Sequence, residues 1–432
     1  MHQATVTAPQ RSQPTQAMLP TNLTTHRHAI HRWYNFIAGF SPEYVHRCIG
    51  LSGLEPGARL IDPFSGLATA LVEANRMGLD AEGYEAHPFF ADIAEAKIGT
   101  RSLSQLDEVS TLLFSAPYHS KPVESYWHGS QLEFLSKLLD VTSLQRLGAA
   151  RDRITDCSAE AKPLFQLVLS RTLEACAGAA TDGIYKAPTT AKLAVPYQVA
   201  LRTITDQIYE DLFAQDFSSF GHSDIWQQSS ENMIFTDDSS IDICVTSPPY
   251  LNNFDYAEMT RMELYFWGYA DSWRSITEKV RSKLIVNTTT APTRLKNDQA
   301  RWAGFLSPSM NDTLTALADQ LADERIRRHG SKDYFKLVLP YFAQMSTVIQ
   351  EAARVLKFGA PLFMVVADAA LYGVHIHTES LIARLLEEAG FSVRRITRLR
   401  DRGDRWVLDK RTGPPGKLGE FEIEAVQMSE TR

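Results

Sequence analysis

The sequence has few cysteines, no long apolar run and no phosphate-binding glycine loop. Its four cysteines (48, 157, 176 and 244) are scattered, with no close pair of the kind that binds zinc. No run of about 18 apolar residues occurs, so no membrane span is expected. A Gly-x-x-x-x-Gly-Lys loop is also missing, which argues against a nucleoside triphosphate. We therefore expect a reduced, cytoplasmic protein without a metal centre.

An excess of positive charge is missing as well, because the formal net charge is -7. Affinity for nucleic acid comes mainly from Lys and Arg, so an acidic chain that binds nucleic acid must concentrate its basic residues. Two stretches do this, and each is also compatible with an ordinary solvated face. They are Arg325, Arg327, Arg328, His329 and Lys332, and then Arg394, Arg395, Arg398, Arg400, Arg402, Arg405, Lys410 and Arg411.

What is present is ample core-forming material, with 44% hydrophobic residues in a chain of 432. Residues 1–25 are rich in Gln, Thr and Pro and are expected to form a disordered leader. A helix over 41–52 is followed by a strand at 59–62, a glycine turn, a helix ending near Gly78 and a strand at 81–85. This β-α-β order predicts an α/β fold with a parallel sheet.

The remaining chain alternates between helical and strand patterns. Residues 100–230 are predicted to form a mainly helical insertion, and strands return at 241–246, 361–366, 391–399 and 421–426. An aromatic helix at 262–269 is expected to be core, and the rest of 252–335 is expected to be irregular. The insertion would separate two parts of one catalytic domain, 26–100 and 230–432.

The first motif with chemical meaning is Asp62-Pro63-Phe64-Ser65-Gly66, between a strand and a helix. A glycine in such a turn lets a ligand approach the backbone. Glu85 ends the next strand, where an acidic side chain can accept hydrogen bonds from both ribose hydroxyls of an adenosine. A turn of this kind is common, but the particular residues in and around it favour an adenosine-type cofactor.

The second motif is Ser247-Pro248-Pro249-Tyr250, directly after a buried strand. Two prolines end the strand and fix an extended turn, which holds the carbonyls of Ser247 and Pro248 at the sheet edge where α/β folds bind ligands. Such acceptors, placed on the hydrogens of an exocyclic amine, favour a pyramidal nitrogen whose lone pair can attack a methyl group. Tyr250 can stack on a base.

Together these motifs resemble the DNA amino-methyltransferases that act on cytosine N4 or adenine N6, over roughly 26–100 and 230–427. The resemblance implies a Rossmann-like methyltransferase sheet with helices on both faces and an antiparallel final strand. S-adenosyl-L-methionine would be the cofactor and a base flipped out of DNA the substrate. The positions implied for the cofactor are Phe40, Ser41, Asp62, Pro63, Phe64, Gly66, Glu85 and, for its adenine, Asp237 or Asp238.

The chain departs from the family at Ala68, where a second glycine is usual; we expect the loop to keep its shape.

Ser247 favours cytosine N4 over adenine N6. Target recognition is expected in 100–230 or in 280–335, and Arg398, Arg400, Arg402 and Arg405 are expected to contact phosphates. A cognate restriction nuclease is a possible partner. The alternatives are an RNA guanine N2 methyltransferase and a non-catalytic nucleic-acid-binding protein on a decayed methyltransferase fold.

Overall fold

The computed structural model describes residues 24–428, apart from 37–38, 40, 119–120, 182–185 and 403–416. The predicted leader therefore lies almost wholly outside the described residues, and so do Phe40 and Arg405. Among the residues described, no helix combines the length and the apolar character that a membrane crossing requires.

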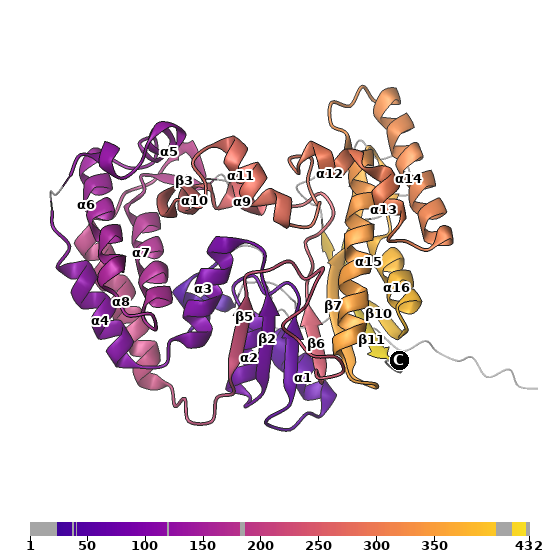
Figure 1. Ribbon diagram of the computed structural model, residues 1–432, viewed down its shortest axis with the longest axis horizontal. Coiled ribbons are helices and arrows are strands. Elements are labelled where there is room, and N and C mark those ends of the chain that lie inside the picture. The colour runs from indigo at the N-terminus through magenta and orange to yellow at the C-terminus, as the bar shows by residue number, and fades with distance from the viewer. Residues whose placement is uncertain are drawn as a thin grey trace, which may run out of the picture.

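A seven-stranded sheet forms the centre of the molecule, in the order β10-β11-β7-β6-β1-β2-β5 (Figure 1). Strands β7, β6, β1, β2 and β5 are mutually parallel, whereas β11 lies antiparallel between β7 and β10. The antiparallel final strand expected from the resemblance is therefore confirmed. The bounds are β1 (Arg59–Asp62), β2 (Asp80–Tyr84), β5 (Ser223–Trp226), β6 (Ile243–Thr246), β7 (Pro361–Ala367), β10 (Phe391–Arg402) and β11 (Leu418–Gln427).

Helices cover both faces of this sheet. Successive strand residues point to opposite sides, so apolar residues of one strand contribute to a core on each face. Ile243 and Val245 of β6 join one hydrophobic core, while Cys244 between them joins the other. The first core is completed by α1 (Pro42–Ser52), α2 (Thr69–Arg76) and α3 (Pro88–Gly99), and the second by α15 (Val338–Val355) and α16 (Thr378–Glu388). The inner parallel strands β1, β2, β6 and β7 are thus mostly buried, as an α/β sheet requires, whereas the edge strand β5 is only partly covered.

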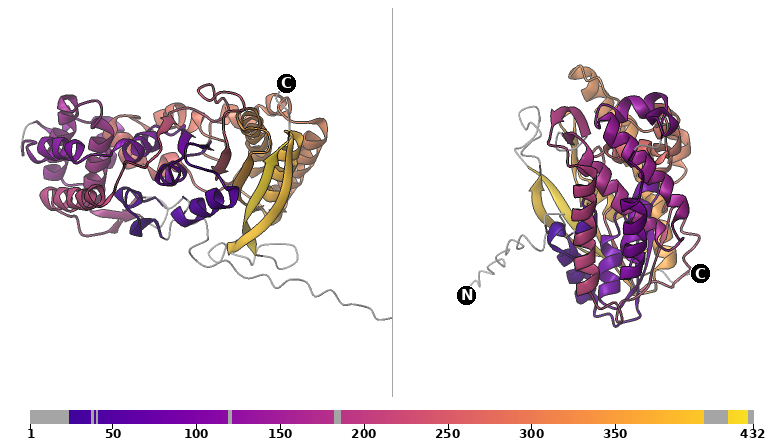
Figure 2. Two further views of the ribbon diagram at one scale, coloured as in Figure 1. Left: turned by 90° about the horizontal axis from the view of Figure 1, so that it is seen from below. Right: turned by 90° about the vertical axis from the view of Figure 1, so that its left-hand side faces the viewer.

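A helical lobe follows α3 and packs against it through α7. Its helices are α4 (Leu103–Phe114), α5 (Gly129–Leu135), α6 (Val141–Asp152), α7 (Lys162–Cys176) and α8 (Tyr197–Ala214), with a small hairpin of β3 (Ala179–Thr181) and β4 (Lys186–Ala191). The lobe and the β10–β11 pair lie at opposite ends of the molecule (Figure 2). The predicted insertion 100–230 was too long at its end, because Ser223–Trp226 is the edge strand β5 of the main sheet.

The region after Ser247-Pro248-Pro249-Tyr250 is more regular than expected. Besides the predicted aromatic helix, seen as α10 (Arg261–Trp267) with Tyr265 and Phe266 fully buried, it contains several further helices. These are α9 (Tyr256–Met259), α11 (Trp273–Lys279), α12 (Thr293–Asn297), α13 (Gln299–Ala303) and α14 (Pro308–Arg327). The short strands β8 (Ala369–Leu371) and β9 (Val374–Ile376) pair with each other after β7. The expectation of an irregular 252–335 was therefore wrong. Its longest helix, α14, gave no clear pattern in the sequence because it is polar and buries only a narrow apolar stripe.

Candidate active site and cofactor pocket

The turn after β1 is held in shape by the carboxylate of Asp62. One of its oxygens accepts hydrogen bonds from the backbone N–H of Phe64 at 3.0 Å and from the hydroxyl of Thr246 at 2.7 Å. Ser65 adds a bond from its hydroxyl to the Asp62 carbonyl at 2.8 Å. Thr246 is the last residue of β6, so this network connects the glycine turn to the strand that carries the second motif.

Glu85 closes the turn from the next strand. Its carboxylate accepts the backbone N–H of Gly66 at 2.9 Å and that of His87 at 2.7 Å, one bond on each oxygen. A carboxylate has about four acceptor sites, so each oxygen retains a lone pair for a further donor. Gly66 itself has a φ of +51° and open space where a Cβ would lie, which leaves the backbone accessible to a ligand.

Ala68 occupies the position where the resemblance led us to expect a second glycine. It caps α2 in the left-handed conformation with a φ of +61°, and it is fully buried. Its N–H donates to the Ser65 carbonyl at 2.7 Å and its carbonyl accepts the N–H of Val72 at 2.9 Å. An alanine therefore bears the backbone strain that glycine would avoid.

The second motif leaves the carboxyl end of β6 beside this turn. The Pro249 carbonyl accepts a hydrogen bond from the hydroxyl of Tyr341 at 2.9 Å, and the Ser247 hydroxyl donates to the Val365 carbonyl at 3.2 Å. These bonds to α15 and β7 fix both ends of the turn. Within the described ranges, no hydrogen bond is recorded to the carbonyls of Ser247 and Pro248. Both remain available as acceptors.

Tyr250 is fixed by residues of the β10–β11 pair. Its hydroxyl donates to Glu420 at 2.9 Å, and Glu420 is held in turn by Arg400, whose Nε lies 2.6 Å from the carboxylate. The guanidinium of Arg402 lies over the ring of Tyr250, 5.0 Å from its centroid. Glu420 is buried, so the pairing with Arg400 keeps its charge compensated.

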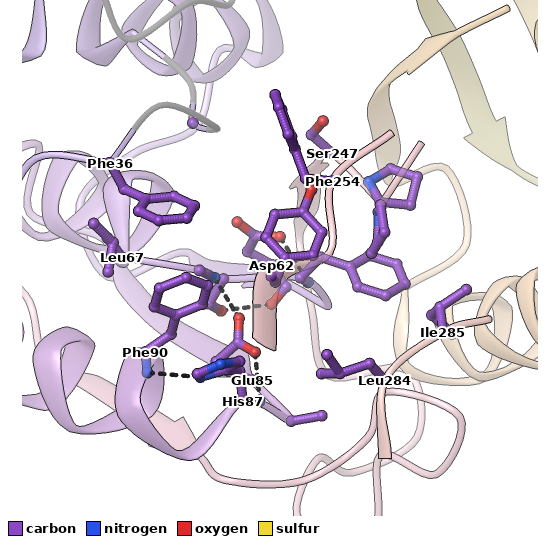
Figure 3. Close-up of a pocket in the computed structure, with 18 of the residues that line it drawn as sticks. Phe36, Asp62, Leu67, Glu85, His87, Phe90, Ser247, Phe254, Leu284 and Ile285 are labelled. Carbon is purple, nitrogen blue, oxygen red and sulfur yellow. Dashed lines mark hydrogen bonds between the residues drawn. The ribbon is translucent and has the colours of Figure 1, made fainter. Parts of the chain in front are cut away.

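Both motifs line one cavity of about 380 Å³ together with Glu85, Arg400, Arg402 and Glu420, and this size is typical of a small-molecule site. The close-up in Figure 3 shows Asp62 and Glu85 on its floor, with Ser247 and Phe254 above them and Leu284 and Ile285 at the side. Phe36 and Phe90 form an aromatic wall with their ring centroids 4.8 Å apart. The cavity thus combines convergent carboxylates and carbonyls with apolar and aromatic walls.

Burial changes the acid–base behaviour of the cavity floor. Desolvation raises the pKa of Glu85 to about 8 and that of Asp62 to about 7, although each accepts hydrogen bonds that oppose the shift. His87 behaves in the opposite sense, because burial lowers its pKa to about 3 and keeps the ring neutral. A ligand that donates hydrogen bonds to Glu85, or that carries positive charge, would favour the ionised carboxylates.

The structure brings most of the predicted residues together, but not all of them. Ser41 caps α1, accepting the N–H of Tyr44 at 3.1 Å, and is not part of the cavity wall. Asp237 and Asp238 are exposed and away from the wall; Asp238 instead pairs with Arg354. Arg398 pairs with Asp401 at the surface. The predicted site residues that do line the cavity are Asp62, Pro63, Phe64, Gly66, Glu85, Ser247, Pro248, Pro249, Tyr250, Arg400 and Arg402.

Several lining residues were not anticipated. Gln228, Ser229 and Ser230 follow β5, the neighbour of β2, and line the same cavity as Glu85. Asn35 and Phe36 contribute a wall from the amino-terminal segment. No sequence signal marks these polar loop residues, because their place in the site depends on β5 being the neighbour of β2.

The strand order and this site are those of a methyltransferase that uses S-adenosylmethionine. Consistent with that class, the chain is related over most of its length to Type II methyltransferases, so the expected resemblance is confirmed. It is 24% identical over 406 residues to M.AvaI of Nostoc sp., covering 85% of this chain and 80% of the relative. With M.BsoBI of Geobacillus stearothermophilus it shares 22% identity over 417 residues, 87% of this chain and 81% of the relative.

Family models and solved structures add little to this relationship. No family model matches the chain. Among solved structures, a SAM-dependent methyltransferase from Methanosarcina mazei aligns with a TM-score of 0.32 at 12% identity, covering 88% of this chain and 98% of the other. Geranyl diphosphate C-methyltransferase from Streptomyces coelicolor aligns with a TM-score of 0.31 at 8% identity, covering 92% and 79%. The fold assignment therefore rests on the strand order itself.

Proposed function

We propose that this protein is a site-specific DNA methyltransferase that transfers a methyl group from S-adenosylmethionine to the exocyclic amino group of a flipped base. The observation that carries the proposal is the hydrogen bond from Thr246 to Asp62, at 2.7 Å. It joins the end of β6, which leads into Ser247-Pro248-Pro249-Tyr250, to the turn that Glu85 closes, and both motifs line one cavity. The relationship to Type II methyltransferases supports DNA as the substrate.

The residues of this chain divide the work between cofactor and base. S-adenosylmethionine, when bound, supplies an electrophilic methyl group. Glu85 would hold its ribose hydroxyls, Gly66 gives the backbone room beside them, and Gln228 to Ser230 would contact its adenine. The buried carboxylates at the cavity floor favour a cationic cofactor over a neutral one.

The carbonyls of Ser247 and Pro248 would act on the target amine. When they accept its two hydrogens, the nitrogen lone pair is withdrawn from conjugation with the ring and is free to attack. The same acceptors stabilise the positive charge that develops on nitrogen as the new bond forms. Because Tyr341 and Val365 hold the turn rigid, these acceptors need no rearrangement during the reaction.

Cytosine N4 is the favoured target and adenine N6 the alternative, because Ser247 stands where Asp or Asn is commoner in adenine enzymes. A base stacked inside a duplex cannot reach acceptors that line a cavity, so the target nucleotide must be flipped. The helical lobe and the segment 280–335 are the candidate DNA-recognition surfaces. If the protein is paired with a restriction nuclease, its methylation should block cleavage at the same sequence.

The test is transfer of a labelled methyl group from S-adenosylmethionine to unmethylated duplex DNA, with RNA as the parallel substrate. Hydrolysis of the product and mass spectrometry of its nucleosides are expected to reveal N4-methyldeoxycytidine, and sequencing should locate it at one recognition site. N6-methyldeoxyadenosine would reassign the base but keep the reaction. Label in RNA alone, or in neither nucleic acid, would overturn the proposal. Gly66→Asp, which places a carboxylate in the cofactor cavity, serves as the inactive control.

A further inference from the structure

The arginines of β10 are not equivalent. Arg395 pairs with Glu424, Arg398 with Asp401 and Arg400 with Glu420, so each of these charges is compensated within the protein. Arg402, the last residue of the strand, has no carboxylate partner in the part of the chain that the structure describes. It is half-buried, and it lines the cavity rather than the outer surface.

The contact that Arg402 makes instead is with Tyr250, where its guanidinium lies 5.0 Å from the ring centroid. Tyr250 cannot easily turn away, because its hydroxyl is bonded to Glu420 and that carboxylate is clamped by Arg400. A flat, delocalised cation therefore covers one face of a fixed aromatic ring inside the cavity. Guanidinium stacks on aromatic faces much as a nucleobase does.

We propose that Arg402 is a placeholder for the target base: its guanidinium covers Tyr250 in the free protein and moves off the ring when the flipped nucleotide enters. This inference rests on the proposed function, since it concerns the base that the site is built to receive. An arriving base stacks on Tyr250 without leaving the aromatic face exposed to water at any stage. The empty pocket is thereby kept in the shape that the base requires.

The displaced guanidinium would not remain unpaired. A flipped nucleotide carries its own phosphates to the mouth of the cavity, and a guanidinium is the group best suited to bind one with two parallel hydrogen bonds. Arg402 would therefore exchange an aromatic partner for a phosphate. Arg400 cannot make the same exchange without breaking its pair with the buried Glu420.

The exchange gives opposite expectations for two kinds of ligand. A nucleoside has no phosphate, so it must displace the guanidinium without compensation. A cation–π contact contributes enough that its removal should tighten nucleoside binding by about two- to thirtyfold. Duplex DNA gains the phosphate contact, so removing the arginine should weaken its binding and lower the slope of log affinity against log salt by about one.

The experiment compares the full-length protein with Arg402→Ala and Arg402→Lys. Binding of deoxycytidine and deoxyadenosine is measured by NMR titration, and binding of a duplex containing the methylated site is measured at several salt concentrations. For Arg402→Ala we expect tighter nucleoside binding together with weaker, less salt-dependent duplex binding. Lysine keeps the charge but not the planar group, so Arg402→Lys should retain most of the salt slope. Arg394→Ala, which removes an exposed arginine of the same strand, should change neither.

Each contrary result has a distinct meaning. If Arg402→Ala weakens nucleoside and duplex alike, the arginine reads or supports the bound base and is not displaced by it. If nucleoside binding is unchanged while the duplex weakens, Arg402 is a fixed phosphate contact at the rim. Either result overturns the placeholder. Failure of methyl transfer would count against the proposed function instead, because the nucleoside titration requires no catalysis. Thermal unfolding of each variant checks that the fold is retained.

Discussion

Replacing Ala68 by glycine should relieve backbone strain at this residue, and a matched control can separate that relief from the other effects of the substitution. Ala68 has a φ of +61°, a conformation that costs an L-residue about 1–2 kcal/mol relative to the right-handed region. Its methyl group is fully buried, so removing it also forfeits about 0.8 kcal/mol of burial. Glycine also increases the conformational entropy of the unfolded chain, which lowers the free energy of unfolding by about 0.4–1 kcal/mol. The three contributions nearly cancel, and Ala68→Gly is expected to be close to neutral.

The matched control is Ala74→Gly in the same helix. Ala74 is also fully buried, but it lies within α2 in the ordinary helical conformation. It loses the same methyl group and gains the same unfolded-state entropy without any relief of strain, so it should cost about 2 kcal/mol. The difference between the two variants therefore measures the strain alone, about 1–2 kcal/mol.

Urea denaturation of the two variants and the parent, analysed with a common slope, gives this difference directly. Calorimetry with S-adenosylmethionine should find the affinity of Ala68→Gly little changed, because the loop already has the conformation that glycine would adopt. Equal destabilisation by Ala68→Gly and Ala74→Gly would refute the reasoning, since it would mean that the turn at Ala68 stores no strain.

Three further results are expected. Gly66→Asp should abolish cofactor binding in calorimetry, and normal affinity would show that the cofactor lies elsewhere. Hydroxyl donors favour the ionised form of Glu85, whose pKa is raised to about 8, so cofactor affinity should fall on the order of tenfold as the pH drops from about 8.5 to 6.5. Glu85→Gln should flatten that profile above pH 7, and an unchanged profile would reject the assignment. Thr246→Val removes a hydrogen bond to the buried Asp62 carboxylate, so the free energy of unfolding should fall by about 1–3 kcal/mol in denaturation. The methyl-transfer rate should also fall; an unaltered rate would mean that the two motifs do not depend on this bond to work together.

The sequence predicted the parts of this fold that have strong local patterns. Strand β1 was expected at 59–62 and is found there, because three buried residues precede a sharp turn. Strand β5 was missed because Ser223–Trp226 is a short edge strand with only one residue buried, which leaves no periodicity to read. Helix α14 was missed for a related reason, since few of its residues are buried.

The candidate site divides in the same way. Asp62 is the last residue of β1, and Glu85 and Ser247 directly follow β2 and β6. Parallel strands bring their carboxyl ends to one edge of the sheet, so the meeting of these residues followed from the β-α-β pattern. Glu420 gave no such signal, because it reaches Tyr250 only through the antiparallel placement of β11 beside β7. The expected cofactor contact at Asp237 or Asp238 was placed by sequence order alone. Instead of these two aspartates, Gln228 to Ser230 line the cavity, and they follow β5, the strand that was missed.

The most direct test of the central claim is a crystal structure of the protein with S-adenosylhomocysteine and a duplex that contains the methylated site. We expect the Glu85 carboxylate within hydrogen-bonding distance of both ribose hydroxyls. The amino nitrogen of a flipped base should lie within hydrogen-bonding distance of the Ser247 and Pro248 carbonyls, with its ring on Tyr250. A base that enters elsewhere, or a cofactor bound away from Glu85, would contradict the account that one cavity brings the two reactants together.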